Sequence, residues 1–294
     1  MLRVMGPLTC ALLGAALLGA AEREHGNVVA ADGVRIAWEA RGTGTPVVVM
    51  VHCWACDRQF FEPQAAALAS DHRVVTLDLP GHGKSGAGRA RWSVTGLGAD
   101  VAHVVKKLKL DRVVLVGHSM GGPTALAAAN LLGERVAGVV LVDTVHDAET
   151  KIPGEALERY AATFEADYEG TMRGMIRALF AGQADPALPE WVLERALLAD
   201  RKATVALLRS FKDVDNSKLL AGAGVPVRAI NAAPLPPAIP ETKTEANRRY
   251  ADFDAVLIEG VGHYLQLEKP AEFNAALRNV LAQIARAGQQ HPLR

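Results

Sequence analysis

The stretch RVVLVGHSMGGPTALAAAN, residues 112–130, is the strongest indication of the fold in this sequence. Its valine-rich start, Val113–Val116, predicts a strand, and its small residues predict a helix over Met120–Leu132. Ser119 lies in the turn between them, within the pattern Gly-x-Ser-x-Gly. A strand, this pattern and a helix in that order favour a serine raised clear of a sheet over an ordinary glycine-rich turn.

Ser119 is the candidate nucleophile. A serine hydroxyl reacts poorly unless it is both presented and activated. A tight turn cramps the backbone, so the residues two before and two after the serine must be small, and they are Gly117 and Gly121. The start of the following helix directs free N–H groups at the same point, and we predict the backbone N–H of Met120 as one donor to a developing oxyanion.

Short apolar runs alternate with helical patterns over most of the remaining chain. Several of the runs are continuously apolar, as expected of parallel strands that are covered on both faces. Further strands are predicted at Val34–Ala40, Val47–Val51, Val74–Leu77, Val139–Val142, Val227–Ile230 and Ala255–Ile258. Further helices are predicted at Asp57–Ala69, Val94–Leu108 and Ala271–Ala285. This alternation predicts an α/β fold with a mostly parallel, doubly wound sheet.

The alternation breaks once, over residues 148–217, where no run predicts a strand. Apolar and aromatic residues recur there at helical spacing. Ligands of open parallel sheets bind at the carboxyl ends of the strands, and an insertion leaving such an end covers the crevice. We therefore expect 148–217 to form a helical cap between two parts of the core, 22–147 and 218–294. Most of the apolar stripe is expected to pack as core, with Met172 and Ile176 as candidate substrate contacts.

A histidine late in the chain is the candidate base. In the stretch AVLIEGVGHYLQLEKPAEF a strand ends, Gly260 and Gly262 make a turn, and His263 follows. A histidine just past the carboxyl end of a strand is placed for proton transfer, and neutral imidazole is a suitable general base. The other histidines lack this context, and no His, Cys and Asp grouping has the spacing of a zinc site. We predict no metal and no cofactor.

Four motifs in order resemble the α/β-hydrolase superfamily: VHCW after an early strand, DLPGHGKS at Asp78–Ser85, GHSMGG, and GVGHYLQLEKP. The resemblance covers nearly all of the chain after its first residues. It implies the α/β-hydrolase fold, a Ser-His-acid triad, an insertion that acts as a cap, and no cofactor. Many members of this kind are esterases, lactonases or C–C bond hydrolases.

The acid of the triad is the point at which this sequence departs from the family. The family usually places it after the strand predicted at Val227–Ile230, but residues 231–239 contain no carboxylate. Some members, including haloalkane dehalogenases, take the acid from the end of the preceding strand, where this chain has Asp143. We predict that Asp143 accepts the second N–H of the imidazole. The alternatives are Asp147 and Glu241, with Asp143 then only capping a turn.

The loop VHCWACD carries Cys53 and Cys56 on either side of Trp54. Cys-x-x-Cys suggests a thiol oxidoreductase, yet the rest of the chain has no thioredoxin-like pattern. By position in the family, His52 matches a histidine, Cys53 a glycine, and Trp54 the residue whose backbone N–H is half of the oxyanion hole. The resemblance therefore implies Trp54 beside Met120 as oxyanion donors, with Trp54 also contacting substrate. A disulfide between the two cysteines stays open.

The first 21 residues have the layout of a secretory signal peptide. An early cation, a short apolar run and small residues precede a cleavage point after Ala21, and the run is too short to span a bilayer comfortably. We expect the remaining chain to be secreted or periplasmic, without stable membrane insertion after cleavage. With 32 basic and 32 acidic residues, the charge gives no reason to expect nucleic acid as a partner. The oligomeric state stays open.

Together these patterns predict an exported serine hydrolase that cleaves carboxylic esters, with a small acyl compound as its substrate. Ser119 attacks, His263 acts as base and then as acid, and Asp143 orients the imidazole, through an acyl-enzyme intermediate. Lactone or C–C bond hydrolysis by the same triad stays open, as does the length of the acyl chain. A slow-turnover role in ligand binding or sensing is a further alternative, because the acid lies at an irregular position.

Overall fold

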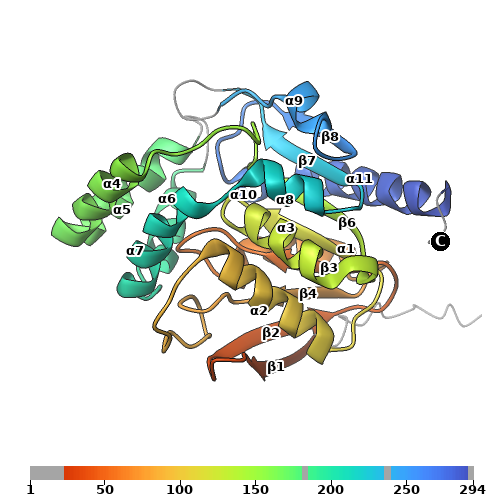
Figure 1. The fold of residues 1–294 in the computed structure, drawn as a ribbon, viewed down its shortest axis with the longest axis horizontal. Coiled ribbons are helices and arrows are strands. Elements are labelled where there is room, and N and C mark those ends of the chain that lie inside the picture. The colour runs from red at the N-terminus through yellow and green to blue at the C-terminus, as the bar shows by residue number, and fades with distance from the viewer. Residues whose placement is uncertain (1–22, 181–184, 235–239, 291–294) are drawn as a thin grey trace, which may run out of the picture.

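The computed structural model describes residues 23–180, 185–234 and 240–290. Within them the chain forms one eight-stranded sheet in the order β1-β2-β4-β3-β5-β6-β7-β8, with helices on both faces (Figure 1). The strands are β1 (Arg23–Val29), β2 (Arg35–Arg41), β3 (Val47–Val51), β4 (Val74–Leu77), β5 (Val113–His118), β6 (Val136–Val142), β7 (Val227–Ala232) and β8 (Phe253–Ile258). The predicted signal peptide, residues 1–21, lies outside the described residues.

The strands from β3 to β8 all run parallel to one another. β1 and β2 pair antiparallel at one edge, and β2 joins the sheet antiparallel to β4. The predicted α/β fold with a mostly parallel, doubly wound sheet is therefore confirmed. A parallel sheet gathers the carboxyl ends of its strands at one edge, and the loops leaving that edge carry the candidate site.

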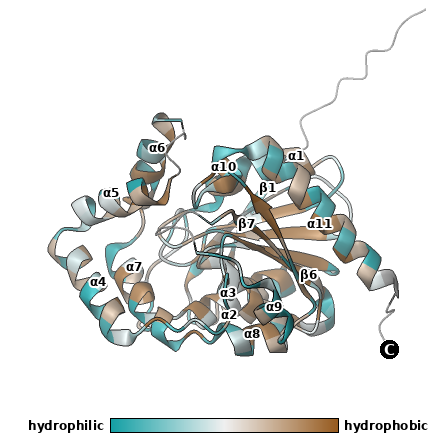
Figure 2. Cartoon of the chain, turned by 90° about the horizontal axis from the view of Figure 1, so that it is seen from above, coloured by the Kyte–Doolittle hydropathy of each residue, from teal (hydrophilic) through white to brown (hydrophobic). Residues whose placement is uncertain are grey.

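Two layers of helices enclose the sheet, and the helices between residues 154 and 210 lie beside these layers (Figure 1). The helices are α1 (Glu62–Leu68), α2 (Val94–Lys107), α3 (Gly121–Leu132), α4 (Gly154–Ala166), α5 (Tyr168–Leu179), α6 (Ala187–Ala196), α7 (Arg201–Ser210), α8 (Asn216–Gly222), α9 (Thr244–Arg248), α10 (Leu265–Glu268) and α11 (Pro270–Gln290). Figure 2 shows α2, α3 and α8 on one side of the sheet and α1 and α11 on the other.

Alternate residues of the central strands face two separate cores. Val49 and Leu115 pack with apolar residues of α2 and α3. Their neighbours Met50 and Val116 pack with residues of α1 and α11 instead. All four side chains are excluded from solvent. Because these strands are covered on both faces, they appear in the sequence as continuous apolar runs, which is what made them predictable.

Between β6 and β7 the described residues form helices and no strand. The helices α4 to α7 stand beside the sheet (Figure 1), whereas α8 packs on α3 and buries Leu220 in the main core. Apolar residues of α4 to α7 share a third core with Cys53, Cys56 and Tyr264. The two cysteines follow the carboxyl end of β3, and Tyr264 follows that of β8. We call α4 to α7 the cap, since they cover the loops at this edge of the sheet.

β1, α8 and α10 were not predicted. β1 lies at the edge of the sheet with most of its residues exposed, so no apolar run marks it in the sequence. α10 is a single turn that directly follows the loop of His263. Over the described ranges, no helix has both the length and the apolar character that crossing a membrane requires.

Candidate active site

Ser119 lies in the sharp turn between β5 and α3, as predicted. Its backbone is left-handed, with φ of 52°, a conformation that costs free energy for any residue with a Cβ. The turn is held to β6, because the Ser119 N–H donates to the carbonyl of Val142 at 3.0 Å. A Cβ on Gly117 would collide with the carbonyl oxygen of Gly121. The turn therefore requires small residues at the two positions that the pattern predicted, and it leaves the serine half-buried.

His263 lies on the loop after β8, and its backbone is fixed from two sides. Its N–H donates to the carbonyl of Leu179, the last residue of α5, at 2.7 Å. Its carbonyl accepts a hydrogen bond from Nε2 of His118 at 2.9 Å. The rings of His118 and His263 also lie against one another, with centroids 4.7 Å apart. Since His118 directly precedes Ser119, these contacts bring the candidate base to the nucleophile turn.

Asp143 follows the end of β6 and is almost fully buried, with 3% of its surface exposed. Nδ1 of His263 donates to Asp143 Oδ2 at 2.6 Å, and the N–H of Ala232 at the end of β7 donates to Oδ1 at 2.9 Å. Burial on its own would raise the pKa of the Asp143 carboxyl, but the hydrogen bond and charge of His263 outweigh it and the pKa is lowered. The carboxylate is thus ionised and placed to hold the imidazole tautomer.

The two alternative acids lie in other surroundings. Asp147 Oδ1 accepts the N–H of Glu149 at 2.9 Å and so caps its own turn. Glu241 is exposed and pairs with Lys243. Of these three carboxylates, the structure brings Asp143 alone to His263, within the described part of the chain.

The loop after β3 contains a disulfide between Cys53 and Cys56, whose Cα atoms are 5.3 Å apart. His52 Nδ1 donates to the carbonyl of Cys53 at 2.8 Å, while its Nε2 accepts the N–H of Leu79 at 2.9 Å. A second histidine, His82, accepts the N–H of Ala55 through Nε2 at 3.1 Å. These bonds brace the loop against the segment after β4.

The predicted oxyanion donors lie at the two turns where the family pattern places them. Within the described residues, the backbone N–H groups of Trp54 and Met120 have no hydrogen-bond acceptor. Met120 is the cap residue before α3, so its N–H belongs to the partly positive end of that helix. Two free N–H groups on these turns match what an oxyanion hole needs, and their role stays a prediction.

The three residues predicted to contact substrate are placed differently. The indole of Trp54 is half-buried, its Nε1 donates to the carbonyl of Thr204 in α7 at 2.8 Å, and its ring packs edge-on against Phe164. Met172 and Ile176 are buried in the third core, between the cap and the cysteine loop. For these two residues a packing role is what the structure displays, and a contact with substrate stays a prediction.

His118 occupies the variable position of the Gly-x-Ser-x-Gly pattern, and the structure gives this side chain specific partners. It is fully buried, and Nδ1 accepts a hydrogen bond from Nε2 of Gln266 at 3.2 Å while Nε2 donates to His263. Burial disfavours the imidazolium and, with the nearby charge of His263, lowers the pKa of His118 to about 3. The available signal was its position beside Ser119, but only the fold shows its partners.

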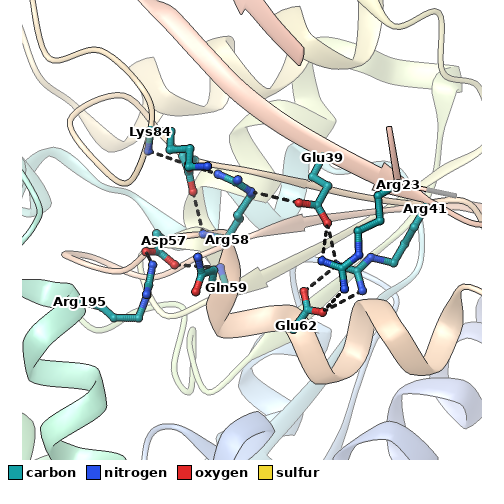
Figure 3. A network of polar contacts seen from close by, with 10 residues as sticks. Arg23, Glu39, Arg41, Asp57, Arg58, Gln59, Glu62, Lys84 and Arg195 are labelled. Atoms are coloured by element: carbon teal, nitrogen blue, oxygen red, sulfur yellow. Dashed lines mark hydrogen bonds and ion pairs between the residues drawn. The ribbon is translucent and has the colours of Figure 1, made fainter. Parts of the chain in front are cut away.

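A network of ion pairs fixes the start of the segment after the cysteine loop (Figure 3). The Arg58 N–H donates to Asp78 Oδ1 at 2.9 Å, and the Arg58 guanidinium pairs with the same carboxylate. Asp57 caps this turn by accepting the N–H of Gln59 at 2.9 Å, and it pairs with Arg195 of α6. The network therefore ties the cap to the core next to the candidate oxyanion loop.

No group of His, Cys, Asp and Glu suited to a metal occurs among the described residues.

Comparison with known proteins identifies the family to which the chain belongs. A sequence profile of the alpha/beta hydrolase family matches residues 48–276, a span that includes Ser119, Asp143 and His263. The chain belongs to the alpha/beta hydrolase family. The predicted α/β-hydrolase fold is confirmed. It is similar to the AB hydrolase superfamily protein YisY of Bacillus subtilis (strain 168), being 26% identical over 245 residues that cover 80% of this chain and 91% of YisY.

Solved structures of esterases share the architecture of this alpha/beta hydrolase. A thermophilic esterase from Thermogutta terrifontis superimposes with a TM-score of 0.77 and 26% identity, covering 89% of this chain and 99% of that one. An esterase from Exiguobacterium antarcticum gives a TM-score of 0.78 over 87% of this chain and 98% of that one. Its identity is 22%, so this second likeness concerns the fold alone.

A longer relative is matched over part of its length. The dihydrolipoyllysine-residue acetyltransferase component of the acetoin cleaving system of Pseudomonas putida is 34% identical over 151 residues. These residues make up 51% of this chain and 39% of that protein. The chain thus spans well under half of this curated relative.

Proposed function

We propose that this alpha/beta hydrolase is an exported carboxylic ester hydrolase that works through Ser119, His263 and Asp143. The observation that carries the proposal is the 2.6 Å hydrogen bond from His263 Nδ1 to Asp143 Oδ2. Because Nδ1 is bonded to Asp143, Nε2 is the nitrogen of the same imidazole that can take the proton of Ser119. His263 is also held against His118, the residue before the strained Ser119.

The proposed reaction is acyl transfer to the serine and then to water. His263 Nε2 takes the proton as Ser119 Oγ attacks the ester carbonyl, and the negative charge develops on the carbonyl oxygen. The N–H groups of Trp54 and Met120 stabilise that oxyanion. His263 then gives its proton to the leaving alcohol, and a water molecule activated by the same imidazole releases the acid. Asp143 stays ionised and stabilises the imidazolium.

The substrate is proposed to be a small molecule with an apolar acyl group. Support comes from the cap, whose inner face shares an apolar core with the candidate oxyanion loop and Tyr264. Similarity to a Thermogutta terrifontis esterase, at 26% identity over nearly the whole of both chains, supports ester cleavage. Lactones are cyclic esters that the same groups would open, so the substrate test includes them.

Export is proposed on two grounds. The first 21 residues have the layout of a signal peptide. The Cys53–Cys56 disulfide suits an oxidising compartment, where such bonds form and persist. Alkaline phosphatase fused after residue 30 should become active outside the cytoplasm, whereas the same fusion lacking residues 2–21 should stay inactive.

Hydrolysis of activated esters tests the proposal. p-Nitrophenyl esters of increasing acyl length and a set of lactones are incubated with the wild type, Ser119→Ala and Asp143→Asn. Wild-type turnover should fall by about 10⁴-fold or more in Ser119→Ala and by a similar order in Asp143→Asn. Full turnover by Ser119→Ala on every active substrate would exclude a serine nucleophile at this position.

A further inference from the structure

A second histidine lies against the candidate acid. His146 comes three residues after Asp143, and its side chain is 12% exposed. Its Nε2 lies 3.5 Å from Asp143 Oδ1, while His263 occupies Oδ2. Oδ1 also accepts the Ala232 N–H at 2.9 Å, so the carboxylate has an imidazole beside each of its oxygens and a backbone donor on one of them.

The surroundings of His146 decide which ring nitrogen carries its proton. Asn231 is fully buried at the end of β7, and its Oδ1 accepts the N–H of Thr144 at 3.3 Å. That contact turns the amide nitrogen toward Thr242 Oγ1, at 2.9 Å, and toward His146 Nδ1, at 3.4 Å. The amide nitrogen of Asn231 can only donate, so its contact assigns Nδ1 of His146 as an acceptor, and the Thr242 hydroxyl then donates its proton to the same nitrogen at 3.1 Å.

Two donors at Nδ1 require that nitrogen to be an acceptor, so the proton of a neutral His146 lies on Nε2. Nε2 is the nitrogen that faces Asp143. Burial lowers the pKa of His146, although the Asp143 carboxylate opposes this, and the ring is therefore neutral near pH 7. A neutral donor can orient the carboxylate without adding a positive charge that would compete with the imidazolium of His263.

The backbone around His146 is also held in place. The carbonyl of His146 accepts the N–H of Lys243 at 2.7 Å. Asn247 of α9 is fully buried, donates to the carbonyl of Val145 at 2.9 Å, and accepts the N–H of Ala148 at 2.9 Å. The segment after Asp143 is thus fixed to the chain that follows β7, so the ring of His146 has a defined position.

We propose that His146 is a positioning residue, oriented by Thr242 and Asn231, that fixes the second carboxylate oxygen of Asp143 for the reaction. Asn231 lies on β7, the strand after which the family usually has its acid, and here it contacts His146 beside Asp143, which follows β6. The proposal rests on the proposed triad function, because Asp143 acts on Ser119 only through His263.

The test compares His146→Leu, which removes the donor, with His146→Gln, whose amide nitrogen reaches a similar position. Thr242→Val removes the hydroxyl that fixes the tautomer while keeping its volume. His103→Gln, on α2, is the matched control, since among the described residues the one hydrogen bond of the His103 ring is to the carbonyl of Val29. For each protein one measures kcat and KM on p-nitrophenyl acetate, the rate of Ser119 labelling by a fluorophosphonate, and the thermal midpoint.

In His146→Leu, kcat and the labelling rate should both fall about tenfold with KM within about twofold of wild type, because the polar group beside the buried Asp143 carboxylate is replaced by an apolar one. His146→Gln should recover most of that loss, Thr242→Val should lose about threefold, and the control should match wild type. Wild-type rates in His146→Leu, or a Gln variant no better than Leu, would overturn the proposal. Should His146→Leu fail to fold, wild-type kcat in Thr242→Val would overturn it.

The labelling rate distinguishes a failure of the proposed His146 role from a failure of the proposed serine hydrolase function. If Ser119 is labelled in the wild type and at the same rate in His146→Leu, the positioning role is excluded while the serine hydrolase function is supported. A wild type that neither hydrolyses esters nor labels on Ser119 removes the proposed function and the positioning role with it.

Discussion

Ser119 is held in a left-handed backbone conformation, with φ of 52°, where a side chain is strained. Asp143 shares this property, with φ of 45°. Residues with a Cβ adopt such angles at a cost that the surrounding structure must offset, and they concentrate at functional sites. Two of the three proposed triad residues are thus placed at the expense of local stability, which makes the strain measurable by substitution.

Replacing Ser119 by glycine should give a more stable protein than replacing it by alanine. Both variants lose the hydroxyl, but glycine adopts a positive φ without the steric cost of a Cβ. Ser119→Gly should exceed Ser119→Ala by about 1 kcal/mol in the free energy of unfolding, measured in urea. Equal stabilities, or alanine the more stable, would show that the turn is not strained at this residue.

Gly121 should not tolerate a side chain. A Cβ there would collide with the carbonyl oxygens of Val51 and His52, at the start of the candidate oxyanion loop. Gly121→Ala should lower kcat by about 100-fold, because a shift of the order of 1 Å in this loop misplaces its donors. Gly174→Ala, in α5 with nothing near its Cβ, is the control and should stabilise the fold by about 0.5–1 kcal/mol. A Gly121→Ala enzyme with wild-type kcat would contradict the described turn.

At the scale of elements, the cap contacts the candidate site at several points. The carbonyl of Leu179, the last residue of α5, accepts the N–H of His263. The next residue, Phe180, stacks on Tyr264 with ring centroids 4.9 Å apart. α7 accepts the indole N–H of Trp54. The position of the cap is therefore coupled to both the candidate base and the candidate oxyanion loop.

Trp54→Phe should loosen this coupling while keeping an aromatic ring. The carbonyl of Thr204 loses its donor, so stability should fall by about 1 kcal/mol, seen as a drop of about 2–4 °C in the thermal midpoint. Because the oxyanion loop is less well fixed to α7, kcat should fall about threefold. Trp38→Phe, in β2 away from the cap, should leave kcat unchanged. A Trp54→Phe enzyme with unaltered kcat and thermal midpoint would show that the indole bond does not fix the loop.

The sequence predicted those elements whose signal is local. The buried strands appear as apolar runs, and β3 and β4 were predicted with their observed bounds, Val47–Val51 and Val74–Leu77. The Ser119 turn was predictable because its glycines are a steric requirement of the turn itself. β1 was missed because an exposed edge strand needs no apolar run.

The surroundings of the candidate acid were less accessible to sequence reasoning. Asp143 was predicted from the end of β6, but its hydrogen bond to Ala232 depends on how β6 and β7 pair. The contacts of His146 with Asn231 and Thr242 join residues about 90 positions apart, which no local pattern reveals. The hydrogen bonds of His118 could not be predicted for the same reason, since its partners His263 and Gln266 lie far along the chain.

At the scale of the whole molecule, buried neutral histidines should make the fold sensitive to acid. Burial lowers the pKa of His52 to about 4, and burial with a neighbouring histidine charge lowers that of His82 to about 3 and that of His118 to about 3. An unfolded chain protonates these side chains near pH 6.5, so below that pH it binds protons that the folded state does not. Stability is therefore complete above about pH 6.5 and falls as the pH is lowered toward the folded-state values.

Urea unfolding between about pH 7 and pH 5 should show this loss, on the order of 2 kcal/mol for each of the three histidines at the lower pH. His82→Gln keeps an acceptor for the Ala55 N–H but cannot titrate, so its stability should depend less steeply on pH than that of the wild type. A free energy of unfolding that stays constant over this range would contradict the neutral, buried state of these rings.

Trapping the acyl-enzyme would test directly whether Ser119 is the nucleophile. The wild type is mixed with an excess of p-nitrophenyl acetate, quenched in acid within the first turnover, digested and analysed by mass spectrometry. We expect an acetyl group on the peptide containing Ser119, localised to that serine, and no such adduct in Ser119→Ala. Ester turnover with no adduct on Ser119, or with the adduct on another residue, would contradict it.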